Sequence, residues 1–295
     1  MTSSWMLVAG VLFALMGAFA KSLAGQFSGA ELAMYRSLFG LVAIGGVLLW
    51  RRMSPRTAFW RGHFWRGVTG TISLVAYFHA MTSLPLATVI TLNYTSPIWL
   101  TLLSVILLKE RFSRRLVAAI ALGFLGVVLV LQPVIASDQA VMGLIGLASG
   151  FFAACAYVNV KKLGDAGEPA WRVVLYFSVV GTVGSALVQP FNGDFHPVDG
   201  ANLWPLLGVG LAATLAQLAM TRAYHSGQTM VVGAFAYSTV IFAALLGAYF
   251  FDEQLPPLAW LGIAIIIVSG LLAGLAKASP PPAADKTPTL PAEED

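Results

Sequence analysis

A short polar stretch, Asn-Tyr-Thr-Ser-Pro at residues 93–97, interrupts a long apolar run in the first half of the chain. Pro97 lacks an N–H, so within a helix it leaves the carbonyl of Asn93, four residues earlier, without its usual hydrogen-bond partner. A helix broken in this way offers backbone groups to a polar ligand, and Trp99 lies close enough to form an apolar wall. A packed kink in which Thr95 bonds the free carbonyl explains the same residues, and the sequence leaves both possibilities open.

Further polar and aromatic side chains lie inside other apolar runs. Ser73 and Tyr77 are four residues apart and share a helical face, and His79 follows at an offset. An ionisable residue in such a run is a functional candidate, because histidine can bind a carboxylate or relay a proton. A neutral histidine that bonds a nearby hydroxyl is the alternative. The candidate ligand-binding side chains are therefore Tyr77, His79, Asn93, Tyr94 and Trp99, with Tyr157, Gln217 and Tyr237 as corresponding candidates later in the chain.

Two cations, Lys21 and Arg36, also fall in or beside apolar runs. Lys21 is placed to extend its ammonium to a membrane interface. Arg36 is deeper, and we expect it to clamp Glu31 or backbone carbonyls; binding a ligand carboxylate is the alternative. The sequence has no zinc-binding helix motif, phosphate-cradling glycine loop or paired cysteine motif, so we expect no metal and no cofactor.

The elements that position these residues follow from the composition. Apolar types make up 58% of the 295 residues and charged types 10%, against roughly 25% charged in an average soluble domain. A helix that spans the hydrocarbon core needs about 20 mostly apolar residues. We therefore expect an all-α membrane protein with ten transmembrane helices, near Trp5–Ala24, Leu32–Trp50, Val68–Ser83, Ala87–Leu108, Leu116–Leu131, Met142–Val160, Trp171–Gln189, Leu203–Arg222, Thr229–Phe251 and Leu258–Leu275.

The positions of Lys and Arg predict how these helices are oriented. Apart from Lys21 and Arg36, every Lys and Arg is expected in alternate loops or in the tail, whereas the opposite loops carry acidic residues. Because cytoplasmic loops are enriched in Lys and Arg, we expect both termini in the cytoplasm. The same distribution argues against nucleic-acid binding, since these cations flank apolar segments and do not cover one solvated face.

The first and second halves of the chain also resemble each other in sequence. A shift that places Tyr94 on Tyr237 also places Ala80 on Ala223 and Glu110 on Glu253. Five helices are an odd number, so a second set must enter the membrane in the opposite sense. We expect two inverted five-helix repeats, residues 1–134 and 135–276, and a disordered cytoplasmic tail at 277–295. Such repeats are typical of secondary transporters, which bind substrate near the midplane between the halves; chance similarity among apolar helices is the alternative.

Three segments carry a family likeness: Met34-Tyr35-Arg36, the stretch from Ala80 to Pro97, and Leu108-Lys109-Glu110-Arg111, whose acid Asp252-Glu253 repeats. With these segments, the sequence over residues 5–275 resembles the bacterial ten-helix EamA-type exporters of the drug/metabolite transporter superfamily, which implies a protein of the bacterial inner membrane. One departure is Val240, which stands where Pro97 has its counterpart. Within this group the chain resembles the aromatic amino-acid exporters, which implies export of amino acids from the cytoplasm. We expect gating or structural roles for Pro97, Arg36, Glu110 and Glu253.

These observations together predict a secondary transporter that works as a single chain in the lipid bilayer. It would bind amino acids, aromatic and other neutral ones, or similar small metabolites in a central midplane cavity and export them by alternating access. Every Asp and Glu is expected in a loop, the tail or a helix end, which argues against a dedicated exporter of cationic drugs and favours zwitterionic or neutral substrates. A multidrug or other metabolite exporter of the same fold stays an alternative, and proton coupling stays open. A membrane enzyme for lipid-linked substrates would need clustered carboxylates or histidines, which are not visible, so we expect no enzyme.

Overall fold

The computed structural model describes residues 3–23, 25–81, 83–110, 113–133, 139–191, 193–252 and 254–275, and this part of the chain is helical without any strand. Its helices are α1 (Trp5–Ser22), α2 (Gly29–Arg51), α3 (Trp60–Met81), α4 (Leu86–Asn93), α5 (Ser96–Leu107), α6 (Arg114–Leu131), α7 (Ala140–Asp165), α8 (Ala170–Val188), α9 (Gly200–Ser226), α10 (Thr229–Ala236), α11 (Ser238–Phe251) and α12 (Pro257–Leu275), with a 3-10 turn, η2 (Gln189–Phe191), after α8.

Nine helical segments of the described residues are long and apolar enough to cross a membrane. Two of them are interrupted: α4 and α5 form one segment, and α10 and α11 form another. The remaining helix, α3, is not among the nine, although its 22 residues extend about 33 Å and the hydrocarbon core is only ~30 Å thick. The all-helical membrane fold is therefore confirmed, and α3 as the tenth span stays a prediction.

Helix α3 begins at Trp60, eight residues before the start near Val68 that the apolar windows predicted. The added turns carry Arg61, His63 and Arg66, whose polarity hid the helix from a hydropathy reading. Two of these side chains are buried in the protein, His63 with 0% and Arg66 with 2% exposure. The expectation that Arg66 lies in a loop with the other cations is therefore wrong: it lies within a helix that packs against α7 and α8.

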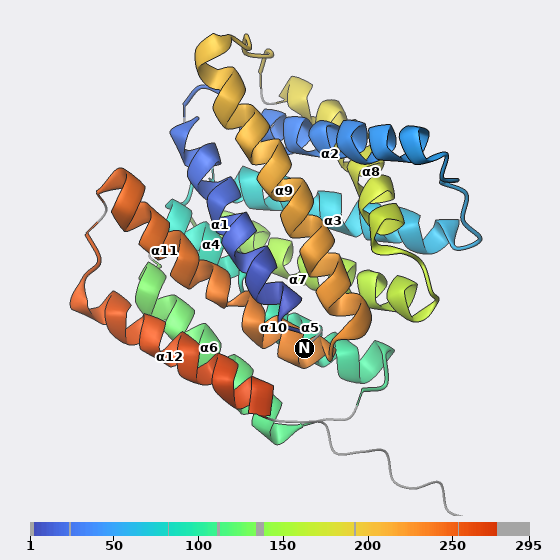
Figure 1. Ribbon diagram of the computed structural model, residues 1–295. Helices are drawn as coiled ribbons and strands as arrows, with labels where there is room; N and C mark the ends of the chain where they lie inside the picture. The colour runs from blue at the N-terminus through green and yellow to red at the C-terminus, as the bar shows by residue number, and fades with distance from the viewer. Residues whose placement is uncertain are drawn as a thin grey trace, which may run out of the picture.

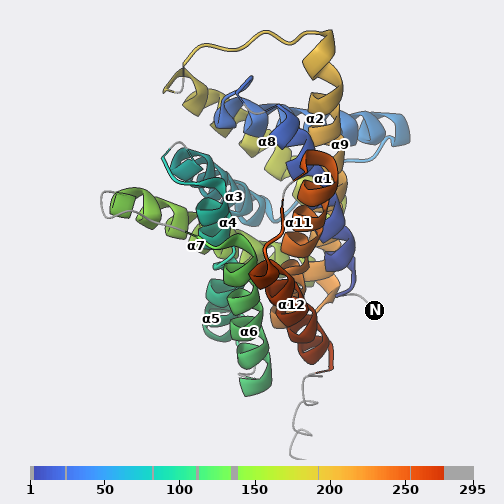
Figure 2. The same ribbon diagram turned by 90° about the vertical axis from the view of Figure 1, so that its left-hand side faces the viewer.

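Two pairs of helices at corresponding positions of the two expected halves, α2 with α8 and α6 with α12, pack against each other in antiparallel fashion. For α2 and α8, Ser28 at the start of one contacts Gln189 at the end of the other, while the carbonyl of Ser54 accepts a hydrogen bond from Arg172. Helices α6 and α12 are paired in the same way (Figure 1). Both views place the α2–α8 pair and the α6–α12 pair at opposite edges of the bundle (Figure 2).

The contacts between non-corresponding helices also occur in matched sets. Helix α3 packs on α7 as α1 packs on α9, and α3 packs on α8 as α2 packs on α9. A twofold relation between residues 1–134 and 135–276 would produce this pattern, because it would exchange α1 with α7, α2 with α8 and α3 with α9. Two inverted repeats stay a prediction with which the packing agrees.

The helix ends that carry most of the Lys and Arg residues meet at one end of the bundle. There the guanidinium of Arg222, near the end of α9, lies 4.5 Å from the ring centroid of Trp5, at the start of α1. At the same end, Thr57 donates a hydrogen bond to Glu168, which precedes α8. We term this the basic end; the connection between α8 and α9, which holds Asp194, lies at the opposite end.

Candidate functional site

The first broken helix lies against α7. The α4 helix ends at Asn93 and α5 begins at Ser96, so the polar stretch found in the sequence is the break itself. The amide of Asn93 donates to Ser149 Oγ at 3.0 Å, across to α7. A Cβ at Gly150 would lie 2.8 Å from the Leu92 carbonyl oxygen and 3.0 Å from that of Asn93, so only glycine lets α7 approach the break this closely.

The second helix is broken at the position predicted by the sequence shift that places Tyr94 on Tyr237. Tyr237 separates α10 from α11, and its ring centroid lies 6.4 Å from that of Tyr94 in the first break. Tyr237 is fully buried. This break forms with Val240 where the first has Pro97, so proline is not required for it. Pro97 itself lies in the first turn of α5, where a missing N–H costs little.

Aromatic and polar side chains from both halves meet between the breaks and α9. The rings of Tyr157 and Tyr224 stack with centroids 5.0 Å apart, and Trp99 packs edge-on against Phe151 at 5.6 Å. Four buried polar atoms in this region have no hydrogen-bond partner among the described residues: Trp99 Nε1, Gln217 Nε2, Tyr224 OH and Tyr237 OH. Buried polar groups normally have partners, so each unpaired one calls for a ligand, a water or a strained fold to explain it. The sequence named three of these four residues and missed Tyr224.

The expected wall of Tyr77, His79, Asn93 and Trp99 is not a single surface. Tyr77 packs beside the α3–α4 contact, with the buried Ala80 and Val89. His79 is exposed in the last turn of α3. The reason is geometric: residues two apart on a helix point about 200° from each other, so Tyr77 and His79 cannot face the same side. In the structure His79 therefore does not join the central group.

Arg36 lies beside a small internal cavity between α2, α8 and α9. The cavity has a volume of about 10 Å³, room for about one water molecule. Its lining residues are Arg36, Ser37, Val174, Phe177, Ser178, Ala213, Thr214 and Gln217. The expected clamp between Arg36 and Glu31 does not form, because the Glu31 carboxylate accepts hydrogen bonds from Ser28 and His196. Arg36 instead faces the interior between the halves.

Arg66 is the residue of this region that the sequence reading missed. It lies on the same face of α3 as Gly70, Ser73 and Tyr77, with spacings of four, three and four residues. Its guanidinium carbon lies 4.1 Å from the ring centroid of Phe177, which also lines the cavity beside Arg36. Extending the Ser73–Tyr77 face back by two turns would have found it.

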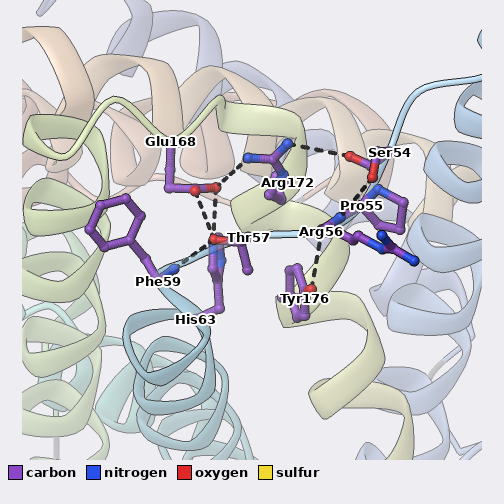
Figure 3. Close-up of polar contacts among 9 residues, drawn as sticks. All are labelled: Ser54, Pro55, Arg56, Thr57, Phe59, His63, Glu168, Arg172 and Tyr176. Atoms are coloured by element: carbon purple, nitrogen blue, oxygen red, sulfur yellow. Dashed lines mark hydrogen bonds and ion pairs between the residues drawn. The ribbon is translucent and has the colours of Figure 1, made fainter.

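A polar cluster at the basic end joins the two halves (Figure 3). Oε1 of Glu168 accepts from Thr57 at 2.7 Å, and Oε2 lies 2.9 Å from Arg172 Nη1 and 3.1 Å from His63 Nε2. Tyr176 donates to the carbonyl of Pro55. Burial alone would raise the pKa of the Glu168 carboxyl, but its hydrogen bonds with Thr57, Arg172 and His63 together lower the pKa below its ordinary value.

A second polar cluster joins the halves at the opposite end. The fully buried carboxylate of Glu31 accepts from the backbone N–H of His196 at 2.7 Å and lies 2.8 Å from its Nδ1. Ser28, which caps α2, donates to Gln189 at 2.7 Å. Polar contacts thus tie α2 to the second half near both of its ends.

Glu110 makes a further contact between the halves at the basic end. It follows α5, and its carboxylate accepts a short hydrogen bond from Thr229, the first residue of α10. Glu110 thus connects the end of α5 to the start of α10 in the other half. Its counterpart Glu253 lies outside the described residues. Among the residues that the structure does describe, no group of three or more His, Cys, Asp or Glu side chains could hold a metal ion.

The comparison with protein families decides the class of this chain. The model of the EamA-like transporter family matches residues 1–132 and 141–275, which correspond to the two expected halves. The chain belongs to this family. An uncharacterized transporter of Helicobacter pylori is 31% identical over 281 residues, covering 92% of this chain and 94% of the relative.

Two further relatives are named for the compound that they transport. A pseudopaline exporter of Pseudomonas aeruginosa is 30% identical over 89% of this chain and 92% of its own length, and a riboflavin transporter of Vibrio cholerae is 30% identical over 90% of each. A solved crystal structure with a TM-score of 0.80 at 19% identity covers 93% of this chain and 97% of its own, which supports the fold alone. The protein is thus a membrane transporter of small metabolites and not an enzyme.

Proposed function

We propose that the protein exports amino acids or similar small metabolites from the cytoplasm by alternating access. The observation that carries this proposal is the group of buried polar atoms without protein partners, contributed by Trp99 in one half and by Gln217, Tyr224 and Tyr237 in the other. A transporter substrate needs donors and acceptors there, because a polar group stripped of water without a partner is costly. Nearby Tyr94, Asn93 and Tyr157 complete the proposed binding residues.

Alternating access requires two halves that can move relative to each other around this group. We assign these halves to residues 1–134 and 135–276, with α3 as the tenth transmembrane helix and residues 277–295 as a tail. Matched helix contacts and two broken helices in corresponding positions support this assignment. The polar clusters around Glu168 and around Glu31 join the halves at opposite ends, so each is suited to open in turn.

Orientation and direction follow from charge and from the relatives. Because Lys and Arg are enriched in cytoplasmic loops, the basic end faces the cytoplasm in this proposal, and both termini lie on that side of a bacterial inner membrane. The pseudopaline relative is named as an exporter, and we assign the same direction of transport here. A single chain supplies both halves of the proposed site, so no second copy is needed.

Counterflow in proteoliposomes tests this function. Purified protein is reconstituted, the vesicles are loaded in turn with each amino acid, and uptake of the labelled counterpart is measured. We expect at least one amino acid to accelerate exchange above empty vesicles and above vesicles with a Gln217→Ala, Tyr237→Phe double variant. Exchange of cationic drugs with no amino acid exchanged would overturn the proposal and favour a multidrug exporter of the same fold.

A further inference from the structure

Two arginines lie inside the helical bundle without an acidic partner. Arg36 is seven residues, or about 10 Å, from the start of α2, and Arg66 is six residues, or about 9 Å, from the start of α3. Helix α2 starts at the end opposite the basic end and α3 starts at the basic end. The two arginines therefore approach the middle of the bundle from opposite ends. Among the described residues, neither forms an ion pair.

The surroundings of Arg66 hold its charge in place without neutralising it. The side chain is 2% exposed, and its Nε and Nη1 have no hydrogen-bond partner in the protein. The ring of Phe177 covers the guanidinium face, which leaves the N–H groups at its edge unpaired. Gly70, one turn later, makes the space, since a Cβ there would overlap Nη1 of Arg66.

Arg36 and Arg66 bracket one polar region. Phe177 packs against Arg66 and lines the same cavity as Arg36, together with Gln217, whose buried amide nitrogen has no partner. Tyr157 on α7 lies close enough to both guanidiniums to sense their charge, and the two guanidiniums lie close enough to repel each other. Phe177 thus connects the cavity and the amide beside Arg36 to the region of Arg66.

The charge balance of this region calls for an anion. Three carboxylates that make contacts between the halves are engaged elsewhere, Glu31 with His196, Glu110 with Thr229 and Glu168 with Arg172, and none of them pairs with Arg36 or Arg66. Burying two like charges without counter-charge is strongly unfavourable, whereas guanidinium binds carboxylate and phosphate in a bidentate fashion. A zwitterion brings one negative group and one positive group, so it leaves the two cations uncompensated.

We propose that the region between Arg36 and Arg66, which in this structure leaves room for only about one water molecule beside Arg36, opens during transport to bind a small metabolite with two anionic groups, one for each arginine. The anionic groups are carboxylates or a carboxylate and a phosphate, because arginine recognises both in the same way. This inference rests on the proposed function and narrows its substrates from neutral and zwitterionic compounds to acidic ones.

Matched pairs of probes test the inference by binding. Purified wild-type protein is titrated at constant pH with glutamate against glutamine, and with O-phosphoserine against serine, while its thermal unfolding is followed. We expect the acidic member of at least one pair to bind at least tenfold more tightly. Preference for glutamate over glutamine assigns a dicarboxylate, and preference for O-phosphoserine over serine assigns a phosphate ester. Equal binding within both pairs would overturn the inference.

Variants assign the preference to the two arginines. Arg66→Gln and Arg36→Gln should each reduce the preference to about twofold, and Arg66→Lys should retain part of it. Arg61→Gln, in the exposed first turn of the same helix, is the matched control and should leave it unchanged. We expect Arg66→Gln to fold, because it removes an unpaired buried charge; if it does not, Arg66→Lys and Arg36→Gln still decide. The inference is overturned if the preference for the acidic probe is undiminished in Arg36→Gln and also in either Arg66 variant.

Counterflow separates this inference from the proposed function. Exchange of leucine or phenylalanine that is as fast as glutamate exchange and independent of Arg66 would leave the transport proposal intact and overturn the dianion site. Absence of exchange for every amino acid, with glutamate still bound in an Arg66-dependent manner, would overturn amino-acid transport and support the dianion site.

Discussion

Trp99 is the side chain whose truncation tests the central group most directly. It packs against Phe151 and the main buried cluster, with its indole N–H unpaired. We expect Trp99→Ala to reduce transport of substrates with large side chains roughly tenfold, because apolar contact is lost, and that of small ones much less. Trp204→Ala, on the exposed face of α9, is the control. Equal effects on large and small substrates would show that Trp99 does not contact the side chain.

Glu168 gives a residue-scale prediction for stability and pH. We expect Glu168→Gln to lower the free energy of unfolding by about 1–3 kcal/mol, because Arg172, Thr57 and His63 lose a charged acceptor. Asp165→Asn is the control: this carboxylate is 55% exposed and pairs only with Lys161 among the described residues, so we expect a change of about 0.5 kcal/mol or less.

The stability difference between wild type and Glu168→Gln depends on pH with a definite sign. The pKa of Glu168 is lower in the folded protein than its ordinary value of 4.5, so its charge stabilises the fold fully above that pH. This stabilisation is lost as the pH falls through the folded-state pKa. In thermal unfolding, wild type and Glu168→Gln should therefore converge below about pH 4.5. A difference that grows on acidification would contradict the assigned pKa shift.

Single residues show where the sequence was informative and where it was not. Asn93, Tyr94 and Tyr237 could be found because polar or aromatic residues interrupt apolar runs at matching positions. Arg66 could not be found from hydropathy, because a buried arginine and a loop arginine have the same hydropathy value. Its helical spacing to Gly70, Ser73 and Tyr77 was the sequence signal, and the contact with Phe177 shows that the side chain lies inside the bundle.

At the scale of elements, the broken helix depends more on α7 than on proline. The second break forms beside Val240 without proline, and Gly150 lies against the carbonyls of the first break. We therefore expect Pro97→Ala to keep transport within about threefold of wild type, since proline in a first helical turn is replaceable. Gly150→Val should abolish transport or folding, because its side chain would meet the Leu92 carbonyl. Gly45→Val, at a helical glycine with open space, is the control for helix propensity.

The contact between α5 and α10 gives a second element-scale prediction. We expect Glu110→Gln to lower the free energy of unfolding by about 1 kcal/mol, because a charged acceptor for Thr229 becomes a neutral one. Substrate selectivity should stay unchanged, since Glu110 lies at the basic end and away from the central group. Lys109→Gln, its exposed neighbour, is the control. Altered selectivity in a stable Glu110→Gln protein would place this acid in the substrate path.

Apolar windows predicted the elements well wherever the helix was apolar throughout. They located the nine hydrophobic segments, including the one that Tyr237 interrupts, to within several residues. They misplaced the start of α3, because helix formation there depends on burial of His63 and Arg66 by the other half. Hydropathy describes single residues, whereas the start of α3 depends on the helices that pack against His63 and Arg66.

At the scale of the whole molecule, antiparallel packing of α2 with α8 and of α6 with α12 is the arrangement that inverted halves require. An odd number of spans per half reverses the second half, and only then do corresponding helices run in opposite directions. Counting α3 as a span makes each half odd. If α3 did not cross, the end of α2 and the start of α4 would lie on the same side, the first half would hold an even number of spans, and the second half would not be inverted.

Labelling from the two sides of the membrane tests this topology. Single cysteines are introduced at Arg56, Lys162 and Asp194, all exposed, in a background where Cys155, the only native cysteine, is replaced by serine. We expect a membrane-impermeant maleimide to label the cysteine at Asp194 in intact cells, and those at Arg56 and Lys162 only after permeabilisation, because loops rich in Lys and Arg stay in the cytoplasm. Arg56 and Lys162 belong to different halves, so their agreement tests the inversion and not merely one loop. Labelling of Asp194 and Arg56 from the same side would exclude the ten-span arrangement.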